Sequence, residues 1–391
     1  MSDPQSRPNE PSCIHAGGVV LVFDRVMHYH RATLQAIDRR LADSRIPFTV
    51  LSALDRAGTK GRVADAAKVV ASHEHFGLSE RRVAGFQLRY QHGLLTGVRR
   101  HAPSVVISTC HSGTFTEWQL LRWARRHGVR RVSWQCGYEY NPGLVKRVVL
   151  GRFVPQFDFH LCYHTNARRY SLQHGAREDQ TLVMHNTIDE RAIRPASRDG
   201  ARRELEARHP ELAGKRIVLY VGAVLDEKRL ERVMEAFDRL AMPDAIFLVV
   251  GDGPHLPALK ARYAARRDWL SVGAVVQGVG VYFDAADVFV LPGTGGLAIN
   301  EAMAHRLPVL SGYADGSADD LVIDGETGFR LREDTAEELA DRLRRILADP
   351  QQGRTMGERG EQRIRGPLSF ESFIDRVVGV LQQQHRLAGK T

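Results

Sequence analysis

The chain has 391 residues, of which 43% are hydrophobic and 26% are charged, with 35 glycines and 16 prolines. This is an ordinary globular composition, and it excludes a disordered, collagen-like or disulfide-scaffold protein. At about 150 residues per domain, the length predicts two or three domains, each large enough to bury a core.

The four cysteines are scattered, without a CxxC pair or a His/Cys cluster, at Cys13, Cys110, Cys136 and Cys162. Disulfide bonds and a structural zinc site are therefore not expected. The protein is expected in a reducing compartment, the cytoplasm. No stretch approaches the roughly 18 uninterrupted apolar residues of a transmembrane helix. Residues 1–16 are polar, lack the apolar centre of a signal peptide, and are expected to be a disordered tail.

The net charge of +9 is unevenly distributed along the chain. Residues 1–200 contain 29 Lys and Arg against 17 Asp and Glu, whereas the remainder contains 26 against 29. Such asymmetry suggests an anionic partner for the first half: a phosphate-bearing substrate, an anionic membrane face or nucleic acid. The alternative is that these arginines lie on solvated faces. No RNP-like, zinc-finger or helix-turn-helix pattern supports nucleic acid, so that partner is not expected.

Apolar runs alternate with amphipathic stretches through both halves of the chain. In the first half, strands are predicted at 17–24, 46–54, 103–109, 129–134 and 157–164, with helices at 30–44 and 116–128. In the second half, strands are predicted at 215–223, 244–253, 286–293 and 308–312, with helices at 227–241, 298–307 and 368–386. Strands that are continuous apolar runs indicate parallel sheets covered on both faces. The pattern occurs twice, which predicts two doubly wound, Rossmann-like α/β domains.

The domain boundary is expected near the polar, aperiodic stretch 186–200. We therefore predict a first domain at 17–188, a second at 189–367, and a C-terminal helix within 368–391 that could pack back on the first domain. Ligands of open parallel sheets bind at the carboxyl ends of the strands, so an interdomain cleft is the expected site of chemistry.

The segment LPGTGGLAINEAMAHRLPVL (291–310) predicts a strand, a glycine-rich turn and a helix. Such a turn lets the backbone approach a ligand closely, and the start of the helix offers N–H groups to an anion. Glu301, just past the first turn, could reach a hydroxyl of a sugar whose phosphate lies at the helix start. The alternative is a plain tight turn followed by a solvated glutamate.

Two other strand ends carry similar signals. In LYVGAVLDEKRLERVMEAF (219–237), Gly222 follows a strand and Lys228 lies near the start of a helix, where a lysine can pair with a diphosphate. In VVGDGP (249–254), Gly251 and Gly253 form a turn at the same edge. A solvated lysine and a purely structural turn are the competing interpretations.

Taken together and in this order, the segments resemble the retaining nucleotide-sugar glycosyltransferases of family 4 (glycosyltransferase group 1), which have the GT-B fold. Residues 219–237 look like the family's strand-Gly-Arg-x-x-x-x-Lys-Gly helix, and VVGDGP matches its Gly-Asp-Gly-Pro. ADVFVLPG with GGLAINEAMAHRLPVL resembles its glutamate-rich loop and helix, DGETGFRL (324–331) its hairpin, and MHNTIDE (184–190) its interdomain segment. The resemblance is dense from about 155 to 350 and weak in the first 150 residues.

The resemblance implies a donor site for a nucleoside-diphosphate sugar in the second domain. Lys228 and Gly222 are implied at the donor diphosphate, and Glu301 is implied at the ribose as the second acid of a Glu-x7-Glu motif. The predicted donor-binding residues are Gly222, Lys228, Arg229, Gly251, Gly253, Gly295, Gly296, Leu297, Ala298 and Glu301. No metal or other cofactor is expected.

Two positions depart from the family pattern. The Arg expected after Gly222 is Ala223, so one diphosphate ligand is absent. The first acid of the Glu-x7-Glu pair is replaced by Gly293, which puts the identity of the donor, and activity itself, in doubt. Arg229, beside Lys228, is a candidate for compensation.

The first half is expected to form the acceptor side. The turn after the first strand carries five candidates: Arg25, His28, Tyr29, His30 and Arg31. Where the family often has a histidine near the donor sugar, this chain has Cys136 or Gly137. His111 and Glu139, each following a predicted strand, are candidate catalytic groups beside Lys228 and Glu301.

The implied reaction transfers a sugar from a nucleoside-diphosphate sugar to an acceptor hydroxyl with retention of configuration. The acceptor is a glycan, a lipid-linked molecule or a small metabolite, and the basic half suits contact with an anionic cytoplasmic membrane face. Two alternatives remain: a sugar-nucleotide epimerase of the same fold, and a catalytically impaired nucleotide-sugar-binding partner subunit.

Overall fold

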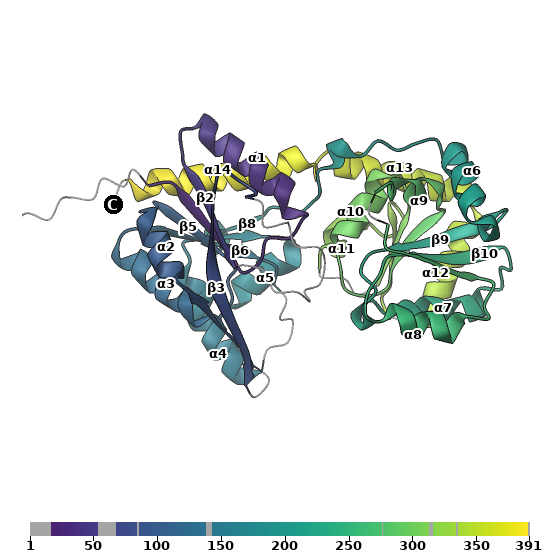
Figure 1. Ribbon diagram of the computed structural model, residues 1–391, viewed down its shortest axis with the longest axis horizontal. Helices are drawn as coiled ribbons and strands as arrows, with labels where there is room; N and C mark the ends of the chain where they lie inside the picture. The colour runs from purple at the N-terminus through teal and green to yellow at the C-terminus, as the bar shows by residue number, and fades with distance from the viewer. Residues whose placement is uncertain are drawn as a thin grey trace, which may run out of the picture.

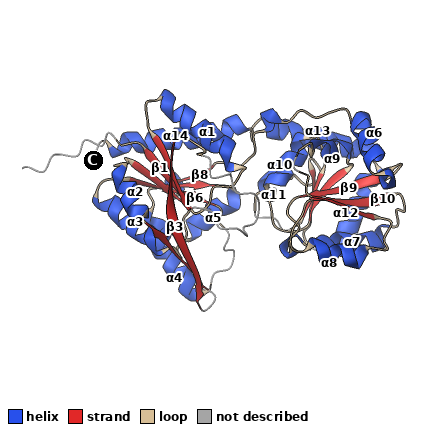
Figure 2. Cartoon of the chain, viewed as in Figure 1, coloured by secondary structure: helices blue, strands red, loops and turns tan. Residues whose placement is uncertain are grey.

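The computed structural model describes residues 17–53, 68–83, 86–137, 143–275, 277–312, 316–333 and 335–389. These residues form two α/β units, each built around its own sheet with helices on both faces (Figures 1 and 2). The predicted fold class, two doubly wound parallel-sheet domains, is therefore confirmed. None of the helices in these ranges combines the length and the apolar character that crossing a bilayer requires.

The first domain contains an eight-stranded sheet in the order β4-β3-β2-β1-β5-β6-β7-β8. Its strands are β1 (Val19–Phe23), β2 (Phe48–Ala53), β3 (Ser72–Val83), β4 (Phe86–His92), β5 (Val105–Ser108), β6 (Arg130–Gln135), β7 (Phe159–Cys162) and β8 (Thr181–Val183). All neighbours are parallel except β3 and β4, which pair antiparallel.

Helices cover both faces of this sheet, which explains why its strands are continuous apolar runs. The helices are α1 (His30–Asp43), α2 (Leu94–Arg100), α3 (Phe115–Arg126), α4 (Leu144–Phe153) and α5 (Thr165–Gln173). Leu21 packs with α1 on one face, whereas its neighbours Val20 and Val22 pack with α2 and α3 on the other. Successive side chains of a strand point to opposite faces, so each face of β1 requires apolar residues.

The second domain contains a six-stranded parallel sheet in the order β11-β10-β9-β12-β13-β14. The strands are β9 (Arg216–Val221), β10 (Ala245–Val250), β11 (Trp269–Gly273), β12 (Val288–Leu291), β13 (Val309–Ser311) and β14 (Gly328–Arg330). The helices are α6 (Arg198–Arg208), α7 (Leu230–Leu240), α8 (Leu256–Tyr263), α9 (Gly280–Ala285), α10 (Leu297–Ala304), α11 (Ala318–Leu321), α12 (Ala336–Ala348) and α13 (Pro350–Arg365). In Figure 1, α7, α8 and α12 lie on one side of the sheet, and α6, α9, α10 and α13 on the other.

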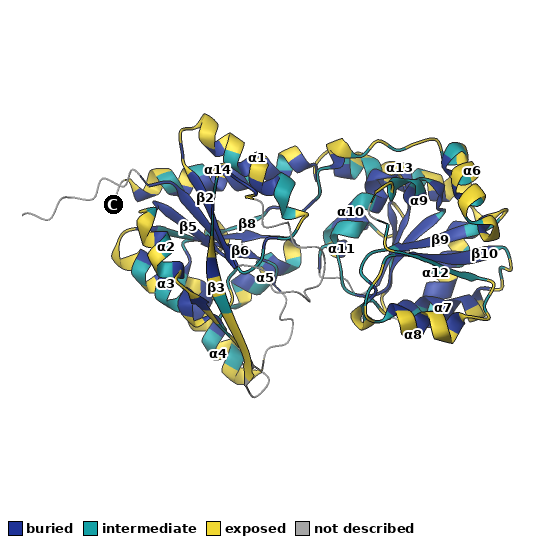
Figure 3. Ribbon diagram, viewed as in Figure 1, coloured by how far each residue is buried: buried dark blue, intermediate teal, exposed yellow. Residues whose placement is uncertain are grey.

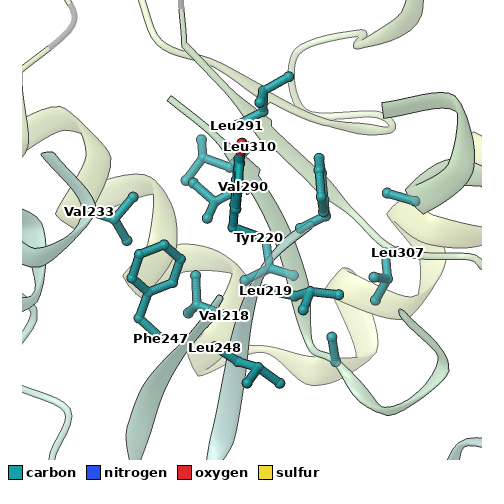
Figure 4. Close-up of a cluster of buried hydrophobic side chains, with 14 of the residues drawn as sticks. Val218, Leu219, Tyr220, Val233, Phe247, Leu248, Val290, Leu291, Leu307 and Leu310 are labelled. Atoms are coloured by element: carbon teal, nitrogen blue, oxygen red, sulfur yellow. The ribbon is translucent and has the colours of Figure 1, made fainter. Parts of the chain in front are cut away.

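The core of the second domain is centred on β9, β10 and β12. Figure 4 shows Val218, Val290 and Phe247 among the side chains that fill it. The apolar side of α7 is buried there, and Val233 belongs to the same cluster. These strands form the rigid floor from which the turns of the candidate site emerge.

The C-terminal helix α14 (Phe370–Ala388) leaves the second domain and packs on the first. Phe370, Phe373 and Val377 belong to the same buried cluster as β1 and α1, and the yellow helix lies beside α1 in Figure 1. Ser369 accepts a hydrogen bond from the Ser372 N–H and caps the helix, a position that serine favours. The chain therefore crosses between the domains twice, near 184–197 and again near 366–369.

Two elements differ from the sequence-based prediction. The antiparallel β3–β4 pair was not predicted, because a strand at the exposed edge of a sheet needs no continuous apolar run. The helix predicted over 227–241 begins only at Leu230; a single 3-10 turn, η5 (Asp226–Lys228), precedes it. Between them Arg229 has φ 54°, a left-handed conformation that breaks the helix.

The end of α7 provides a test of backbone strain. Ala241 ends this helix with φ 53°, so replacing it with glycine is expected to stabilise the fold by about 1 kcal/mol. Ala264 ends α8 with φ −55°, and Ala264→Gly is the matched control, expected to destabilise. Chemical denaturation of both exposed variants measures the difference. Equal losses of stability in both would contradict a left-handed Ala241.

Candidate functional site

The turn after β9 is held between the turns after β10 and β12 by contacts that only glycine permits. A Cβ atom on Gly251 would lie 1.8 Å from the Gly222 carbonyl oxygen, and one on Gly253 would lie 2.2 Å from that of Val224. A Cβ atom on Gly293 would lie 2.1 Å from the carbonyl oxygen of Glu227. All three approaches are far inside van der Waals contact, so the three turns form one tightly packed backbone layer at the carboxyl edge of the sheet.

Backbone hydrogen bonds join the same three turns. The N–H of Gly222 donates to Val250 O at 3.0 Å, and that of Val224 donates to Asp252 O at 2.9 Å. On the other side, the Thr294 N–H donates to Glu227 O at 3.1 Å. These bonds fix η5, and with it the side chain of Lys228.

Lys228 extends over the glycine-rich turn that precedes α10. Its ammonium group donates to the carbonyl oxygen of Thr294. A Cβ atom on Gly295 would lie 3.2 Å from the Lys228 Nζ atom. The structure therefore brings together Gly222, Lys228 and the turn 293–296, which the sequence had placed at separate strand ends.

Helix α10 carries Glu301 and is anchored at both its ends. At its N-terminal half, the Asn300 side-chain amide donates to Thr187 Oγ1 at 3.0 Å, in the segment that links the domains. At its C-terminal end, buried His305 lies 2.7 Å from Asp284 and stacks on Phe283. Gly296, the N-cap, and the following Leu297 and Ala298 present the first backbone N–H groups of the helix beside Lys228.

Glu301 is partly buried and lies within electrostatic reach of the first domain. Burial raises the pKa of its carboxyl group, while His305 and His28 oppose this shift. His28 follows β1 in the first domain, so the two carboxyl edges face one another here. Within the candidate site, this is the electrostatic contact that joins predicted donor-side and acceptor-side residues.

The five predicted acceptor-side residues do not form a uniform basic cluster. His30 begins α1, accepts the Met27 N–H on its Nδ1 atom at 3.1 Å, and has a pKa lowered to about 4 by burial. His30 is therefore neutral at pH 7 and adds no positive charge to this turn. Arg25 pairs with Glu80 of β3 at 3.4 Å, and Arg31 lies in the first turn of α1.

Tyr29 and His28 are the exposed members of this turn. Burial of the Tyr29 hydroxyl, together with the nearby Cys136 thiol, raises the pKa of Tyr29. Cys136 follows β6, so the loops after β1 and β6 meet at the carboxyl edge. Glu139, the other candidate of that loop, lies outside the described residues.

His111 lies on the exposed loop after β5. The buried carboxyl group of Glu117, which was not predicted from the sequence, binds the backbone of this loop. Glu117 of α3 accepts the N–H groups of Cys110 at 2.8 Å and of His111 at 2.9 Å, and the hydroxyl of Ser108. Burial raises the pKa of Glu117 to about 7, with Asp24 contributing. Thr114-x-x-Glu117 matches a capping-box sequence, but the Glu117 carboxyl group binds the loop before Thr114 and does not cap the helix, so this local pattern does not predict its role.

A second contact between the domains was also missed. Asp320 of α11 accepts the Thr165 N–H at the start of α5 at 2.8 Å and lies 3.3 Å from His185 Nδ1. These partners lower the pKa of the Asp320 carboxyl group despite its burial. Asp320 lies in the first turn of α11 and ties this helix to the first domain.

Comparison with known proteins places this geometry in context. Residues 201–363 match the family model "Glycosyl transferases group 1". The chain is 29% identical over 200 residues to the alpha-D-kanosaminyltransferase of Streptomyces kanamyceticus. The matched region covers 49% of this chain and 51% of that protein. It is 28% identical over 186 residues to the sulfoquinovosyl transferase of Arabidopsis thaliana, covering 46% of this chain and 36% of that protein. The matched region thus spans about half, or less, of these relatives.

Solved structures resemble both domains of the chain and cover 94% of it. The Anabaena protein HepE, crystallised with UDP, superposes with a TM-score of 0.70 at 15% identity, covering 94% of this chain and 100% of that one. Sucrose-phosphate synthase from Thermosynechococcus elongatus gives 0.72 at 18% identity, covering 94% and 98%. At such identities the likeness establishes the fold alone, and that fold is GT-B.

Gly293 offers a test of the packed backbone layer. Gly293→Ala is expected to lower the free energy of unfolding by about 3 kcal/mol, because even a methyl group overlaps the backbone of Glu227 and Lys228. Gly293→Glu, which restores the acid of the resembled motif, is expected to destabilise at least as much. Gly379→Ala, at an exposed position of α14 with open space around it, is the control and is expected to be neutral or stabilising. A neutral Gly293→Ala would show that the turns do not touch.

Glu117 predicts a pH dependence of stability. Its pKa is about 7 in the folded chain against an ordinary 4.5, so the folded state binds this proton more tightly than the unfolded state. Its contribution is therefore greatest below pH 4.5 and is lost as the pH rises to about 7, by about 3 kcal/mol in total. The free energy of unfolding of the wild type minus that of Glu117→Gln is therefore expected to fall between pH 4.5 and about 7. Exposed Glu211→Gln is expected to show no such trend, and a flat Glu117 difference would contradict the assignment.

Proposed function

We propose that this chain, whose second domain is a group 1 glycosyltransferase domain, transfers a sugar from a nucleoside-diphosphate sugar to an acceptor hydroxyl, with retention of anomeric configuration. The observation that carries the proposal is the position of Lys228. Its ammonium group lies at the carbonyl of Thr294, over the turn that starts α10. A fixed cation and helix N–H groups at one strand edge suit a diphosphate.

The arrangement can stabilise the charge that develops during transfer. When the bond between the sugar and the diphosphate breaks, its electron pair stays on the diphosphate. Lys228 and the N–H groups of Gly296, Leu297 and Ala298 are placed to offset that charge without reorganising. Glu301, on the next turn of the same helix, is assigned to the ribose of the donor, where it orients the nucleotide.

Arg229 is assigned as the second cation of the donor site, because Ala223 cannot fill that role. Arg229 is exposed directly after Lys228 and holds a left-handed conformation, which for a non-glycine residue persists only where the surroundings enforce it. Gly251, Gly253 and Gly295 keep the neighbouring turns close to this loop. Gly293 leaves no space for a side chain, so the acid missing there has no substitute at that position.

The acceptor is proposed to bind on the loops of the first domain that face Glu301. His28 lies within electrostatic reach of Glu301, and Tyr29 is exposed beside it. His111, presented by the loop that Glu117 holds, is the remaining described candidate for a catalytic group at this edge. A glycan, a glycolipid or a small metabolite with a free hydroxyl fits this assignment.

Calorimetry with nucleoside diphosphates and their sugars tests the donor site. Lys228→Met is expected to weaken binding of the preferred nucleoside diphosphate about tenfold or more, because a charge-assisted contact is lost. Lys215→Met is the matched control: this lysine lies just before the opposite end of β9, donates to the Pro243 carbonyl at 2.8 Å, and is expected to leave binding unchanged. In the same assay, Arg229→Gly is expected to weaken binding of the nucleoside diphosphate, although glycine removes the strain of the left-handed backbone at this position.

The donor identified in this way is then used to test the reaction. Nuclear magnetic resonance of the product is expected to show the anomeric configuration of the donor. Inversion would refute the retaining mechanism. If the wild type binds none of the nucleoside diphosphates or their sugars, the transferase proposal fails, and a partner subunit without a working donor site, consistent with Ala223 and Gly293, replaces it.

A further inference from the structure

Helix α4 has an apolar face on each side, and one of them is exposed to solvent. Leu144, Val145 and Val148 are 80%, 70% and 54% exposed, and at 3.6 residues per turn they lie on one face. The buried side of the helix is formed by Leu150 and Phe153. A surface helix of a globular protein normally turns its polar residues outward, so this exposed face requires an explanation.

Further exposed apolar residues lie on the neighbouring elements α3 and β4. Phe115, the first residue of α3, is 60% exposed and stacks on exposed Tyr90 of β4 at a ring distance of 6.3 Å. One turn further along α3, Trp118 packs on Phe153 of α4 at 4.7 Å. Leu88, two residues before Tyr90 and on the same face of β4, is also exposed. We call these six exposed residues, Leu88, Tyr90, Phe115, Leu144, Val145 and Val148, the α4 surface. Figure 3 shows exposed residues along α4 and the outer end of the β3–β4 pair.

The charge around the α4 surface has one sign. Residues 143–157 contain Lys146, Arg147 and Arg152 and no acidic residue. Arg147 and Arg152 are exposed at the rim of the apolar face. On the hairpin, Arg81 lies directly opposite Leu88 in the antiparallel register and therefore on the same face. Exposed apolar side chains rimmed by arginine are the chemistry that binds an anionic bilayer surface.

We propose that the α4 surface attaches this chain to the surface of an anionic membrane. The apolar side chains enter the boundary between headgroups and acyl chains, and Arg147, Arg152 and Arg81 meet the lipid phosphates. A few apolar residues with a few cations give reversible attachment.

The α4 surface lies beside the carboxyl edge of the first sheet. Phe115 follows the loop after β5, and α4 follows the loop after β6, so the α4 surface borders the carboxyl edge where His28 and His111 lie. Attachment there would bring that edge to the membrane. This step rests on the proposed function, and it makes a lipid-linked molecule the acceptor; the attachment itself does not depend on it.

Vesicle flotation of the full chain tests the attachment. We expect binding to vesicles of phosphatidylcholine containing about a third phosphatidylglycerol, and much weaker binding to phosphatidylcholine alone or at high salt. The double variant Leu144→Glu/Val148→Glu is expected to lose binding at least tenfold, and Arg147→Gln about fivefold. Leu387→Glu, at an exposed leucine of α14, is the matched control and is expected to bind as the wild type does.

Three results would overturn the proposal. The first is a wild type that does not float with anionic vesicles. The second is a double variant that binds as well as the wild type. The third is a wild-type dimer, seen by light scattering, that the double variant dissociates while vesicle binding is absent, because the α4 surface would then join two copies. Calorimetry of nucleoside diphosphates on the same variants is expected to be unchanged, so failure of the donor site and failure of membrane attachment are distinguishable.

Discussion

The close approach of three backbone turns in the second domain determines where its chemistry can occur. β9 lies between β10 and β12 in the sheet, so the turn after β9 must pass between the turns that follow its neighbours. At each crossing one residue has no side chain, because Gly251, Gly253 and Gly293 meet carbonyl oxygens within 1.8 to 2.2 Å of where a Cβ atom would be. This packing fixes η5, and η5 carries Lys228 to the start of α10. The absence of an acid at position 293 and the position of Lys228 are therefore two consequences of one constraint.

Elsewhere in the molecule, hydrogen bonds from buried or partly buried side chains, and not backbone packing, fix the positions of loops and helices. Glu117 binds two N–H groups of the loop that presents His111, and a buried carboxyl group without such partners would be costly. Asn300 ties α10 to Thr187 between the domains, and Asp320 ties α11 to the start of α5. Glu117 thus supports the loop of an exposed candidate, His111, whereas Asn300 and Asp320 tie the second domain to the interdomain segment and to the first domain.

Much of the fold was predictable because both sheets are covered on both faces. A strand such as β1 must then be apolar at every position, and its run of five buried residues is visible in the sequence. The helices predicted at 227–241 and 368–386 were visible for a similarly local reason, because apolar residues recur in them at helical spacing. The β3–β4 pair was not, because SHEHFGLSERRV lies at an exposed edge and carries no such run. The start of α7 was misplaced because the left-handed conformation of Arg229 is enforced by its surroundings and not by its own propensity.

The sequence by itself determined the two-domain α/β architecture, the turns at the carboxyl ends of β9, β10 and β12, and the residues Lys228 and Glu301 that follow two of these turns. These are local properties: apolar periodicity, glycine placement and the order of motifs along the chain. Only the tertiary structure decided that His30 is neutral, that Glu117 supports the loop of His111, that Gly293 leaves no space for an acid, and that α4 turns an apolar face outward. Burial and close approach depend on residues distant in the chain, and no local pattern encodes them.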